Sequence, residues 1–505
     1  MNHWIILPVV LPALIAALIV LAMRHDLVLQ RVCGVTCSVA MVVLAGGLLW
    51  SASVNPPQVY FLGDWPAPFG IVLVLDRLAA LMLALVAVLG LVVQVYVVGT
   101  GWDARGKHFH ALFLFQVMGL NGAFLTGDAF NLFVFFEVLL IASYGLMIHG
   151  GGRDRLRAGV QYVAFNLIGS TLFLFALALV YAVTGTLNLA DLAVKVAALP
   201  PGDAGLLRVA GVLMLLVFAV KGALVPLQFW LPGTYANAPG PVAALFAVMT
   251  KVGAYAVIRV FTLVFPAGTA ATGTLFADLL MPAALVTIAV GAVGVLGATT
   301  MARAAAFAGI ASMGTLFVAV AAFQVQATAA ALYYLIHSTL AGAAMFLVVD
   351  LVTGRRGSGA LQGPTAPFVQ SGLLGGLFLA AAVALAGMPP LSGFIGKLLV
   401  MDALRGEMAM VWSVILGGSF LMILGFARAG SHVFWKSDAN PDAHAHDPHG
   451  AEPLAFVAVF ALLAGLAALT VLAGPVTAWL DTTAQGLHDP AAYIAAVLAR
   501  EGEGS

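Results

Sequence analysis

Apolar residues in this chain form long continuous runs separated by short polar segments, unlike the alternation of a half-buried strand. A run of about 20 apolar residues crosses a bilayer as a helix. We therefore predict an all-α integral membrane protein with about fourteen transmembrane helices, in which residues 1–505 form a single transmembrane domain. The predicted helices lie near residues 4–23, 32–52, 71–98, 109–127, 129–149, 160–184, 206–231, 241–264, 275–298, 302–322, 328–351, 370–404, 409–433 and 453–474.

Composition agrees with this pattern. Hydrophobic residues make up 63% of the chain and charged residues 8%, with a mean hydropathy of +1.08, values that exclude a soluble domain. The formal net charge of zero argues against a nucleic-acid surface, which needs a basic patch. The first apolar run has no basic region ahead of it and no small-residue cleavage site after it, so we expect it in the mature protein. Cys33 and Cys37 are too few for an iron–sulfur centre and are expected to pack between helices.

Lysine and arginine are distributed unevenly over the predicted loops, and short cytoplasmic loops are enriched in both. If the N-terminus is outside, the inner loops hold Arg24, Arg31, Arg105, Lys107, Arg153, Arg155, Arg157, Arg303, Arg355, Arg356, Arg428 and Lys436. The outer connections and the tail then hold Lys195, Arg208, Arg405 and Arg500. This asymmetry predicts an even number of helices with both termini on the extracytoplasmic side.

The seventh and twelfth predicted helices are interrupted by proline. Pro226 follows Lys221 in the seventh helix, and Pro389 and Pro390 precede Lys397 in the twelfth. Proline removes a backbone donor and clashes with the preceding turn, so each helix is expected to break within the membrane.

Interrupted helices at matching positions of two halves are typical of transport sites. The second break follows the first at an interval of five helices, which predicts two inverted five-helix repeats, approximately 105–265 and 275–436. The alternative is that the prolines only kink packed helices.

Glu137, Lys221, Lys251 and Lys397 are ionisable residues inside apolar runs. A charge near the bilayer centre costs roughly 2.5–3.5 kcal/mol on insertion scales, and such residues normally face a bundle interior or a water-filled path. His337, on the eleventh predicted helix, is suited to relay protons between two lysine sites. We predict a proton route built from these five side chains. The alternatives are a static ion pair for the acid and a packing role for the histidine.

Within this route, Glu137 and Lys221 are expected to form a switchable pair because they share mid-membrane depth. Lys251, Tyr255 and Arg259 recur every fourth residue on the eighth predicted helix and predict a polar line along one face. Arg259, near the helix end, either continues this line or anchors a fixed charge.

Other polar residues carry weaker predictions. Asp76 with Arg77, and Asp350 with Arg355 and Arg356, are expected to be ion pairs at helix ends. The loop that contains His444, His446 and His449 is expected to be solvated, and it leaves the identity of any metal site unknown. The residues that either hold water or hydrogen-bond between helices are Gln116, Asn121, Gln161, Asn166, Ser170 and Ser392.

The chain contains no Walker loop, no Gly-rich dinucleotide fingerprint and no CxxC motif. We therefore expect no cofactor of its own and no nucleotide-driven step. Energy is expected to come from an ion gradient or from a partner protein.

The stretches GDAFNLFVFFEVLLIASYGL, VKGALVPLQFWLPGTYANAPGPVAALFAVMTKVGAYAVIRV and GMPPLSGFIGK together resemble the antiporter-like membrane subunits shared by respiratory complex I and the Mrp-type Na+/H+ antiporters. The resemblance covers roughly residues 70–435. Within that superfamily, FFEVLLIASYGL and TGTLNLADLA look most like the D subunit of the Mrp antiporters. The resemblance implies fourteen helices, a bacterial inner-membrane location, and assembly with other Mrp subunits.

The resemblance also implies residue roles. Glu137 matches the essential acid of the fifth helix, Lys221 its partner on the seventh and Lys251 the central lysine of the eighth. His337 matches the relay of the eleventh helix, and Lys397 takes the twelfth-helix position where some complex I relatives carry glutamate. Many relatives have a further polar residue after the histidine, where this chain reads AGAAMF, so the relay is expected to depend more on the histidine and water.

The expected function is therefore secondary transport, not enzyme catalysis: external protons exchange for internal sodium or a similar cation. One alternative is a proton-pumping subunit of an NADH:quinone oxidoreductase or membrane-bound hydrogenase, and another is a structural scaffold. The sequence leaves open which cation is carried, whether it crosses this subunit, how many protons move and which subunits are neighbours.

Overall fold

The computed structural model describes residues 3–269, 271–362, 368–436 and 452–499. Helices dominate these residues, because long apolar segments satisfy their backbone hydrogen bonds internally. The α-helices are α1 (Leu7–Ala22), α2 (Leu27–Val54), α3 (Arg77–Thr100), α4 (Phe109–Leu125), α5 (Ala129–Met147), α6 (Arg153–Thr184), α7 (Leu189–Ala198), α8 (Gly205–Lys221), α9 (Trp230–Asn237), α10 (Gly240–Leu263), α11 (Leu275–Gly297), α12 (Met301–Ala321), α13 (Val325–Arg356), α14 (Ser371–Ala386), α15 (Ser392–Ala403), α16 (Met408–Gly430), α17 (Pro453–Val471), α18 (Ala473–His488) and α19 (Ala491–Leu498).

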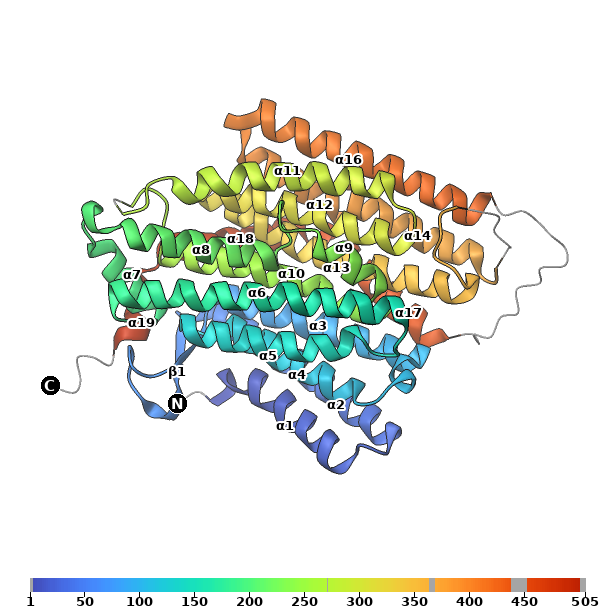
Figure 1. Cartoon of the computed structure of the whole chain (residues 1–505), viewed down its shortest axis with the longest axis horizontal. Helices are drawn as coiled ribbons and strands as arrows, with labels where there is room; N and C mark the ends of the chain where they lie inside the picture. The colour runs from blue at the N-terminus through green and yellow to red at the C-terminus, as the bar shows by residue number, and fades with distance from the viewer. Residues whose placement is uncertain (1–2, 270, 363–367, 437–451, 500–505) are drawn as a thin grey trace.

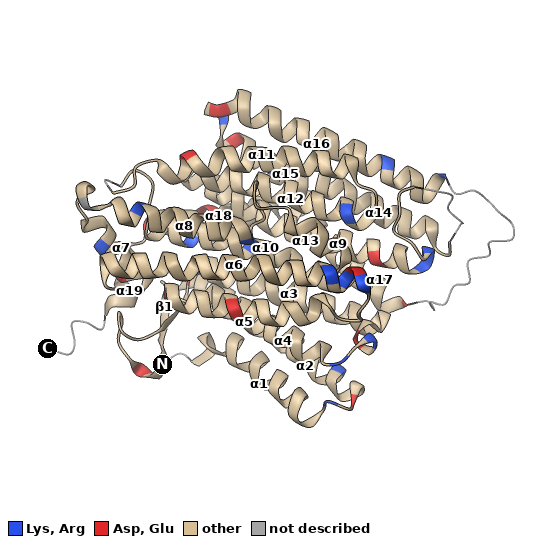
Figure 2. Cartoon of the chain, viewed as in Figure 1, with Lys and Arg blue, Asp and Glu red and all other residues tan. Residues whose placement is uncertain are grey.

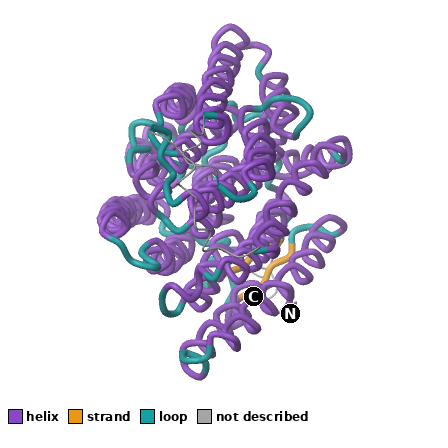
Figure 3. The backbone as a smooth tube through the Cα atoms, turned by 90° about the vertical axis from the view of Figure 1, so that its right-hand side faces the viewer, coloured by secondary structure: helices purple, strands orange, loops and turns teal. Residues whose placement is uncertain are grey.

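Most helices run along the long axis of the molecule, and both chain termini lie at the same end (Figure 1). Strands β1 (Gln58–Phe61) and β2 (Val72–Leu75) pair antiparallel, with Gln58 opposite Leu75. A view along the long axis shows the helices end-on and this short hairpin beside the termini (Figure 3).

The prediction of an all-α membrane protein is confirmed. The predicted spans coincide with a helix or a pair of helices except at the start of 71–98, where β2 (Val72–Leu75) precedes α3. Within the described residues, 10 helices are long and apolar enough to cross a membrane by length and composition. Because α1, α4 and α14 are shorter apolar helices, the count of fourteen stays a prediction.

The two breaks fall where the prolines predict them. Lys221 ends α8 and Trp230 begins α9, while Ala386 ends α14 and Ser392 begins α15. The indole Nε1 of Trp230 donates to the Val220 carbonyl at 3.0 Å, so a carbonyl freed at the end of α8 regains a partner. At each break the lysine is buried, whereas the prolines Pro226, Pro389 and Pro390 are exposed.

The last helical column is longer than the predicted span at 453–474. α17 and α18 are separated by one turn residue, Leu472, and both pack along α13. α19 then packs on α7 at the end of the molecule that holds the termini (Figure 1). The segment after the predicted span thus supplies both the second half of this column and α19.

α10 forms the centre of the bundle, since every residue from Pro241 to Leu263 is buried. Lysine and arginine gather toward the end opposite the termini (Figure 2). This distribution agrees with the charge asymmetry of the loops, while the assignment of that end to the cytoplasm stays a prediction.

Candidate functional site: a line of buried ionisable side chains

The five predicted site residues lie on a series of helices in which each helix packs against the next. α5 packs on α6, α6 on α8, α8 on α10, α10 on α13, and α13 on α15. These helices carry Glu137, Lys221, Lys251, His337 and Lys397, with α6 supplying polar groups between the first two. The helices that carry the five side chains therefore form a continuous packed series through the bundle.

Glu137 and Lys221 are connected through α6 and form no direct ion pair within the described residues. The Ser170 hydroxyl donates to Oε1 of Glu137, and the Nζ of Lys221 donates to Oδ1 of Asn166 at 3.0 Å. Ser170 and Asn166 are four residues apart on α6, so they face the same side of that helix. The acid and the base still interact electrostatically. The predicted pair is thus bridged by two neutral polar side chains.

Lys221 is placed by the break itself, because it is the last residue of α8. Gly253 on α10 lies against this turn: a Cβ there would be 2.6 Å from the Gly222 nitrogen and 2.7 Å from the Phe218 carbonyl. A cavity of about 10 Å³ borders Lys221, Asn166 and residues of α10. This is close to the volume that one water molecule needs, so the space toward α10 suits a hydrated contact.

Lys251 occupies the centre of the molecule and is 2% exposed. In the described part of the chain its ammonium has no hydrogen-bond or ion-pair partner. It lies within electrostatic reach of His337 on α13. Nearby Gln116, on α4, donates to the Met249 sulfur, whereas its Oε1 has no partner among the described residues. The acceptor left free on Gln116 thus lies next to Met249, two residues from Lys251 on α10.

The second break holds His337 and Lys397. The Nδ1 of His337 is hydrogen-bonded to the hydroxyl of Ser392, the first residue of α15, at 2.9 Å. The Nζ of Lys397 donates to the carbonyl of Ala386, the last residue of α14, at 2.8 Å, and to Ser419 at 2.7 Å. A cation at a helix C-terminus is stabilised by the helix dipole and by the free carbonyls. The broken helix thus supplies partners to both titratable groups.

Gly387 gives Lys397 room to reach those carbonyls. Its φ of +80° is left-handed, and an added Cβ would lie 2.6 Å from Cδ of Lys397. Glycine adopts this conformation without strain and leaves space for the lysine stem.

Two predicted end-of-helix ion pairs are wrong. Asp76 pairs with Arg259, through bonds of 2.6 and 2.7 Å, while Arg77 donates to the Ser53 carbonyl. Asp350 accepts from Tyr96 at 2.7 Å and from Trp102 at 2.8 Å; its predicted partner Arg355 pairs instead with Glu452, and Arg356 donates to the Ala360 carbonyl. Arg259 therefore anchors a fixed charge, one of its two predicted roles.

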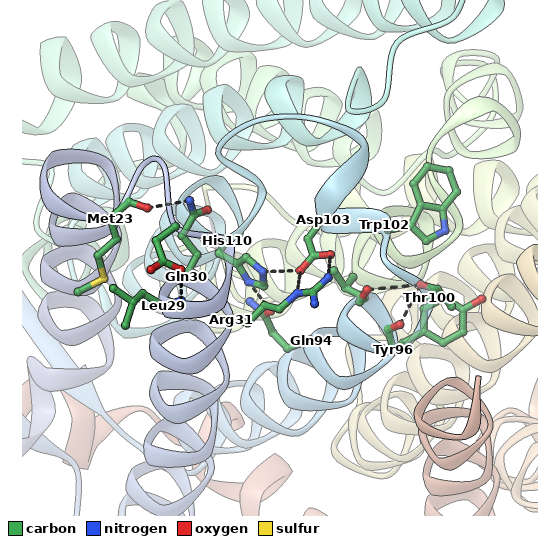
Figure 4. A network of polar contacts seen from close by, with 12 residues as sticks. Met23, Leu29, Gln30, Arg31, Gln94, Tyr96, Thr100, Trp102, Asp103 and His110 are labelled. Carbon is green, nitrogen blue, oxygen red and sulfur yellow. Dashed lines mark hydrogen bonds and ion pairs between the residues drawn. The ribbon is translucent and has the colours of Figure 1, made fainter. Parts of the chain in front are cut away.

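A polar network that gave no signal in the sequence lies at the end opposite the termini (Figure 4). Asp103, in the 3-10 helix η3 (Trp102–Arg105), accepts two bonds from Arg31 of α2 at 2.7 and 2.8 Å. Its carboxylate also contacts His110 of α4, whose other ring nitrogen contacts Gln94 of α3, both at 2.9 Å. Burial alone raises the pKa of Asp103, but the bonds from Arg31 and His110 outweigh it and lower that pKa to about 2. An acid and a histidine seven residues apart match no motif that predicts this contact.

The remaining predicted features have plain outcomes. The Sγ of Cys33 lies 3.6 Å from the Met23 sulfur and Cys37 is buried, as expected for packing residues. His444, His446 and His449 lie outside the described residues, and within the described ranges no group of three metal-ligating side chains is present. Asn121 bonds the Pro8 carbonyl at 2.9 Å and thus connects α4 to α1.

The family described as NADH:quinone oxidoreductase/Mrp antiporter, TM matches residues 126–425. The probable D subunit of a K(+)/H(+) antiporter from Rhizobium meliloti (strain 1021) is 39% identical and aligns over 100% of this chain and 99% of its own length. The D subunit of a Na(+)/H(+) antiporter from Bacillus subtilis (strain 168) is 37% identical over 99% of this chain and 100% of its own length.

Solved structures have the same fold. A chain of the Mrp complex from Dietzia sp. DQ12-45-1b superposes with a TM-score of 0.87 and 28% identity, covering 99% of this chain and 100% of its own. A chain of respiratory complex I from Thermus thermophilus superposes with a TM-score of 0.79 and 23% identity, covering 98% of this chain and 99% of its own. This likeness shows the fold alone.

Proposed function

Because the chain belongs to the NADH:quinone oxidoreductase/Mrp antiporter membrane-subunit family, we propose that it is a proton- and cation-translocating subunit of a multisubunit monovalent cation/proton antiporter. End-to-end alignment with the D subunits of a K(+)/H(+) and a Na(+)/H(+) antiporter supports this choice. It is a transporter subunit in this proposal, located in the bacterial inner membrane with other antiporter subunits as partners.

The observation that carries the proposal is the series of ionisable residues across both helix breaks, of which Glu137 is partly buried and the others are buried. Glu137, bridged to Lys221 by α6, forms one end, and Lys397 on the C-terminus of α14 forms the other. Lys251 and His337 lie between them, and both Lys251 and Lys397 interact electrostatically with the imidazole. Isolated charges at such depth are costly, so a continuous series of them is expected where ions or protons move.

We propose that charge changes at one end of this path move protons along it. When Glu137 and Lys221 exchange a proton through Ser170, Asn166 and water, the charge next to α10 changes. Lys251 then gives up or accepts a proton, His337 carries it between the helices, and Lys397 holds it at the second break. The gradient of one ion thereby drives the other without a cofactor.

The direct test is proton movement reported by a dye in everted vesicles that contain the whole assembly. Sodium and potassium are compared, because the relatives carry the names of antiporters for either cation. Wild type should exchange at least one of them for protons, and Lys221→Ala should lose exchange while assembly stays intact. Full exchange by an assembled Lys221→Ala complex would favour a structural scaffold instead.

A second candidate function is a proton-pumping subunit of an NADH:quinone oxidoreductase or membrane-bound hydrogenase. The fold that this chain shares with a chain of respiratory complex I supports this second candidate. Such an assembly contains redox cofactors in other subunits, whereas an antiporter needs none. Flavin or iron–sulfur absorbance in the purified native assembly would support the redox alternative and contradict the antiporter proposal.

A further inference from the structure

A polar column runs along α10 from its centre toward the end of the molecule that holds the termini. Lys251, Tyr255 and Arg259 occupy every fourth position, about 6 Å apart along the axis. The Tyr255 hydroxyl donates to the Phe124 carbonyl at 2.7 Å, and the Nε of Arg259 approaches that hydroxyl at 3.4 Å. Tyr255 and Arg259 are therefore hydrogen-bonded, and Lys251 lies about one turn further along the same face of α10.

The column ends at a buried ion pair. Both terminal nitrogens of Arg259 bond the carboxylate of Asp76, which also caps the N-terminus of α3 by accepting from the Ala79 N–H at 2.8 Å. The Arg259 side chain is 5% exposed and that of Asp76 12%. Asp76 is thus the last group of the column before the surface.

A cavity of about 220 Å³ lies directly beyond this pair. Its walls include Asp76, Arg259, Thr483, Asp489 and Tyr493, so α18 and α19 cover it from the outside. Its volume is enough for several water molecules. The cavity therefore continues the polar column toward the aqueous side.

Tyr493 of α19 forms part of the cavity wall next to the ion pair. It is 5% exposed, and its hydroxyl has no hydrogen-bond partner among the described residues. Its ring also lies under the Arg259 guanidinium, 5.2 Å from ring centroid to Cζ.

The charges that line the cavity balance. Asp76 and Asp489 face Arg77 and Arg259, and the remaining polar walls are hydroxyls and one amide. A dehydrated alkali cation needs several oxygen ligands and is repelled by the guanidinium groups. A proton moves along hydrogen-bonded water without a cation occupying the site. The chemistry thus favours protons over sodium or potassium here.

We propose that this cavity is a hydrated access site through which protons reach the α10 column from the end that holds the termini, with the Asp76–Arg259 ion pair as its closed gate. The site goes beyond the five-residue path, and it rests on the proposed function only in taking protons as the transported species. The predicted topology makes this the extracytoplasmic side.

Cysteine labelling tests the access site in the assembled complex. In a background of Cys33→Ala and Cys37→Ala, Thr483→Cys on the cavity wall should be modified by a membrane-impermeant thiosulfonate applied to the outer face. Exchange should then fall at least tenfold. Gln485→Cys, on the same helix but exposed and outside the cavity, should be modified equally while exchange stays within twofold. Absence of outer-face labelling at position 483, or labelling that leaves exchange intact, would overturn the proposal.

A second variant tests the gate. Asp76→Asn keeps an N-cap side chain of the same shape but removes the charge that holds Arg259. We expect a pH gradient across vesicles with this variant to collapse several-fold faster than with wild type in the absence of sodium and potassium. If the pH gradient collapsed no faster with Asp76→Asn than with wild type, the ion pair would not act as a gate. The extent of labelling at position 483 and the rate of the leak are both measured without cation exchange. A wild type that fails to exchange therefore refutes the proposed function and leaves these two outcomes interpretable.

Discussion

At the scale of single residues, the buried path depends on neutral side chains as much as on charged ones. Asn166 and Ser170 stand between Glu137 and Lys221, so neither charge contacts the other directly. Such spacing keeps an acid and a base coupled without fixing them in a static salt bridge. A direct buried pair would be harder to separate during a transport cycle.

The bridge on α6 should therefore be sensitive to change. Asn166→Ala removes the acceptor of the buried Lys221 ammonium, and an unsatisfied buried donor costs about 1–3 kcal/mol. We expect a lower melting temperature and an exchange rate reduced at least tenfold in vesicles. Gln485→Ala, at an exposed position on α18, is the control and should match wild type. Unchanged exchange in the Asn166 variant would show that the bridge has no part in transport.

Lys397 offers a test that separates a moving proton from a fixed charge. Arginine keeps the positive charge next to the α14 terminus but does not release its proton in proteins. If Lys397 takes part in proton transfer, Lys397→Arg should lose exchange nearly as fully as Lys397→Ala. Dye-reported exchange provides the measurement, with Lys195→Arg, a surface lysine paired with Asp191 at 2.9 Å, as the control. Near-normal exchange with arginine would mean that charge alone suffices.

At the scale of helices, the breaks could be predicted from sequence because their cause is local. Proline removes a backbone donor wherever it stands, so Pro226 and Pro390 predict interruption without knowledge of neighbours. The partners of end-of-helix charges could not be predicted in this way. Arg355 follows Asp350 by five residues and points to another side of α13, since helical neighbours are three or four residues apart. Asp350 instead meets Tyr96, 254 residues away in the chain.

The ionisable residues of the path could be predicted from sequence because the signal for each of them is also local. A charged residue inside an apolar run is recognisable in the sequence alone, and this identified Glu137 and the three buried lysines. Arg259 shows the limit, because its neighbours on α10 leave two roles open and only the position of Asp76 on another helix decides between them. Asp103 and His110 were missed because they lie near helix ends, where polar residues are ordinary.

Close contact between α8 and α10 sets the distance from Lys221 to Lys251. Gly253→Ala would place a Cβ 2.6 Å from the Gly222 nitrogen, a backbone atom that cannot move without shifting the break. We expect exchange to fall at least tenfold and the melting temperature to drop. Gly47→Ala, in the middle of α2 with no atom within 4 Å of the added Cβ, is the matched control. It should be neutral or slightly stabilising because alanine favours helix more than glycine does. Equal behaviour of the two variants would contradict a role for this contact.

At the scale of the whole molecule, the two ends of the bundle are built differently. The end with the termini holds the β1–β2 hairpin, α7 and α19, whereas the opposite end carries most of the lysine and arginine residues (Figures 1 and 2). At this second end, Arg31, Asp103, His110 and Gln94 connect α2, η3, α4 and α3 (Figure 4). The network joins α2, α3, η3 and α4 into one unit, so its loss should affect the stability of the entire fold.

Because of this network, the stability of the fold should decrease as the pH falls. The pKa of Asp103 is about 2 in the folded protein, against 3.8 as its ordinary value, because the bonds from Arg31 and His110 outweigh burial. A carboxyl with a depressed folded pKa stabilises the fold above its unfolded pKa and loses that contribution as pH falls through the folded value. The shift corresponds to about 2 kcal/mol at neutral pH, and the loss should occur between about pH 4 and pH 2.

Melting temperatures of the detergent-purified complex across this pH range provide the measurement. Asp103→Asn keeps the size of the side chain but cannot carry the charge that Arg31 binds, so it should melt lower than wild type at pH 7. The gap should narrow as the pH approaches 2, because wild type loses the same charge by protonation. Asp481→Asn, an exposed acid on α18, is the control and should follow wild type at every pH. A gap between wild type and the Asp103 variant that stays constant down to pH 2 would mean that the carboxylate acts through shape rather than charge.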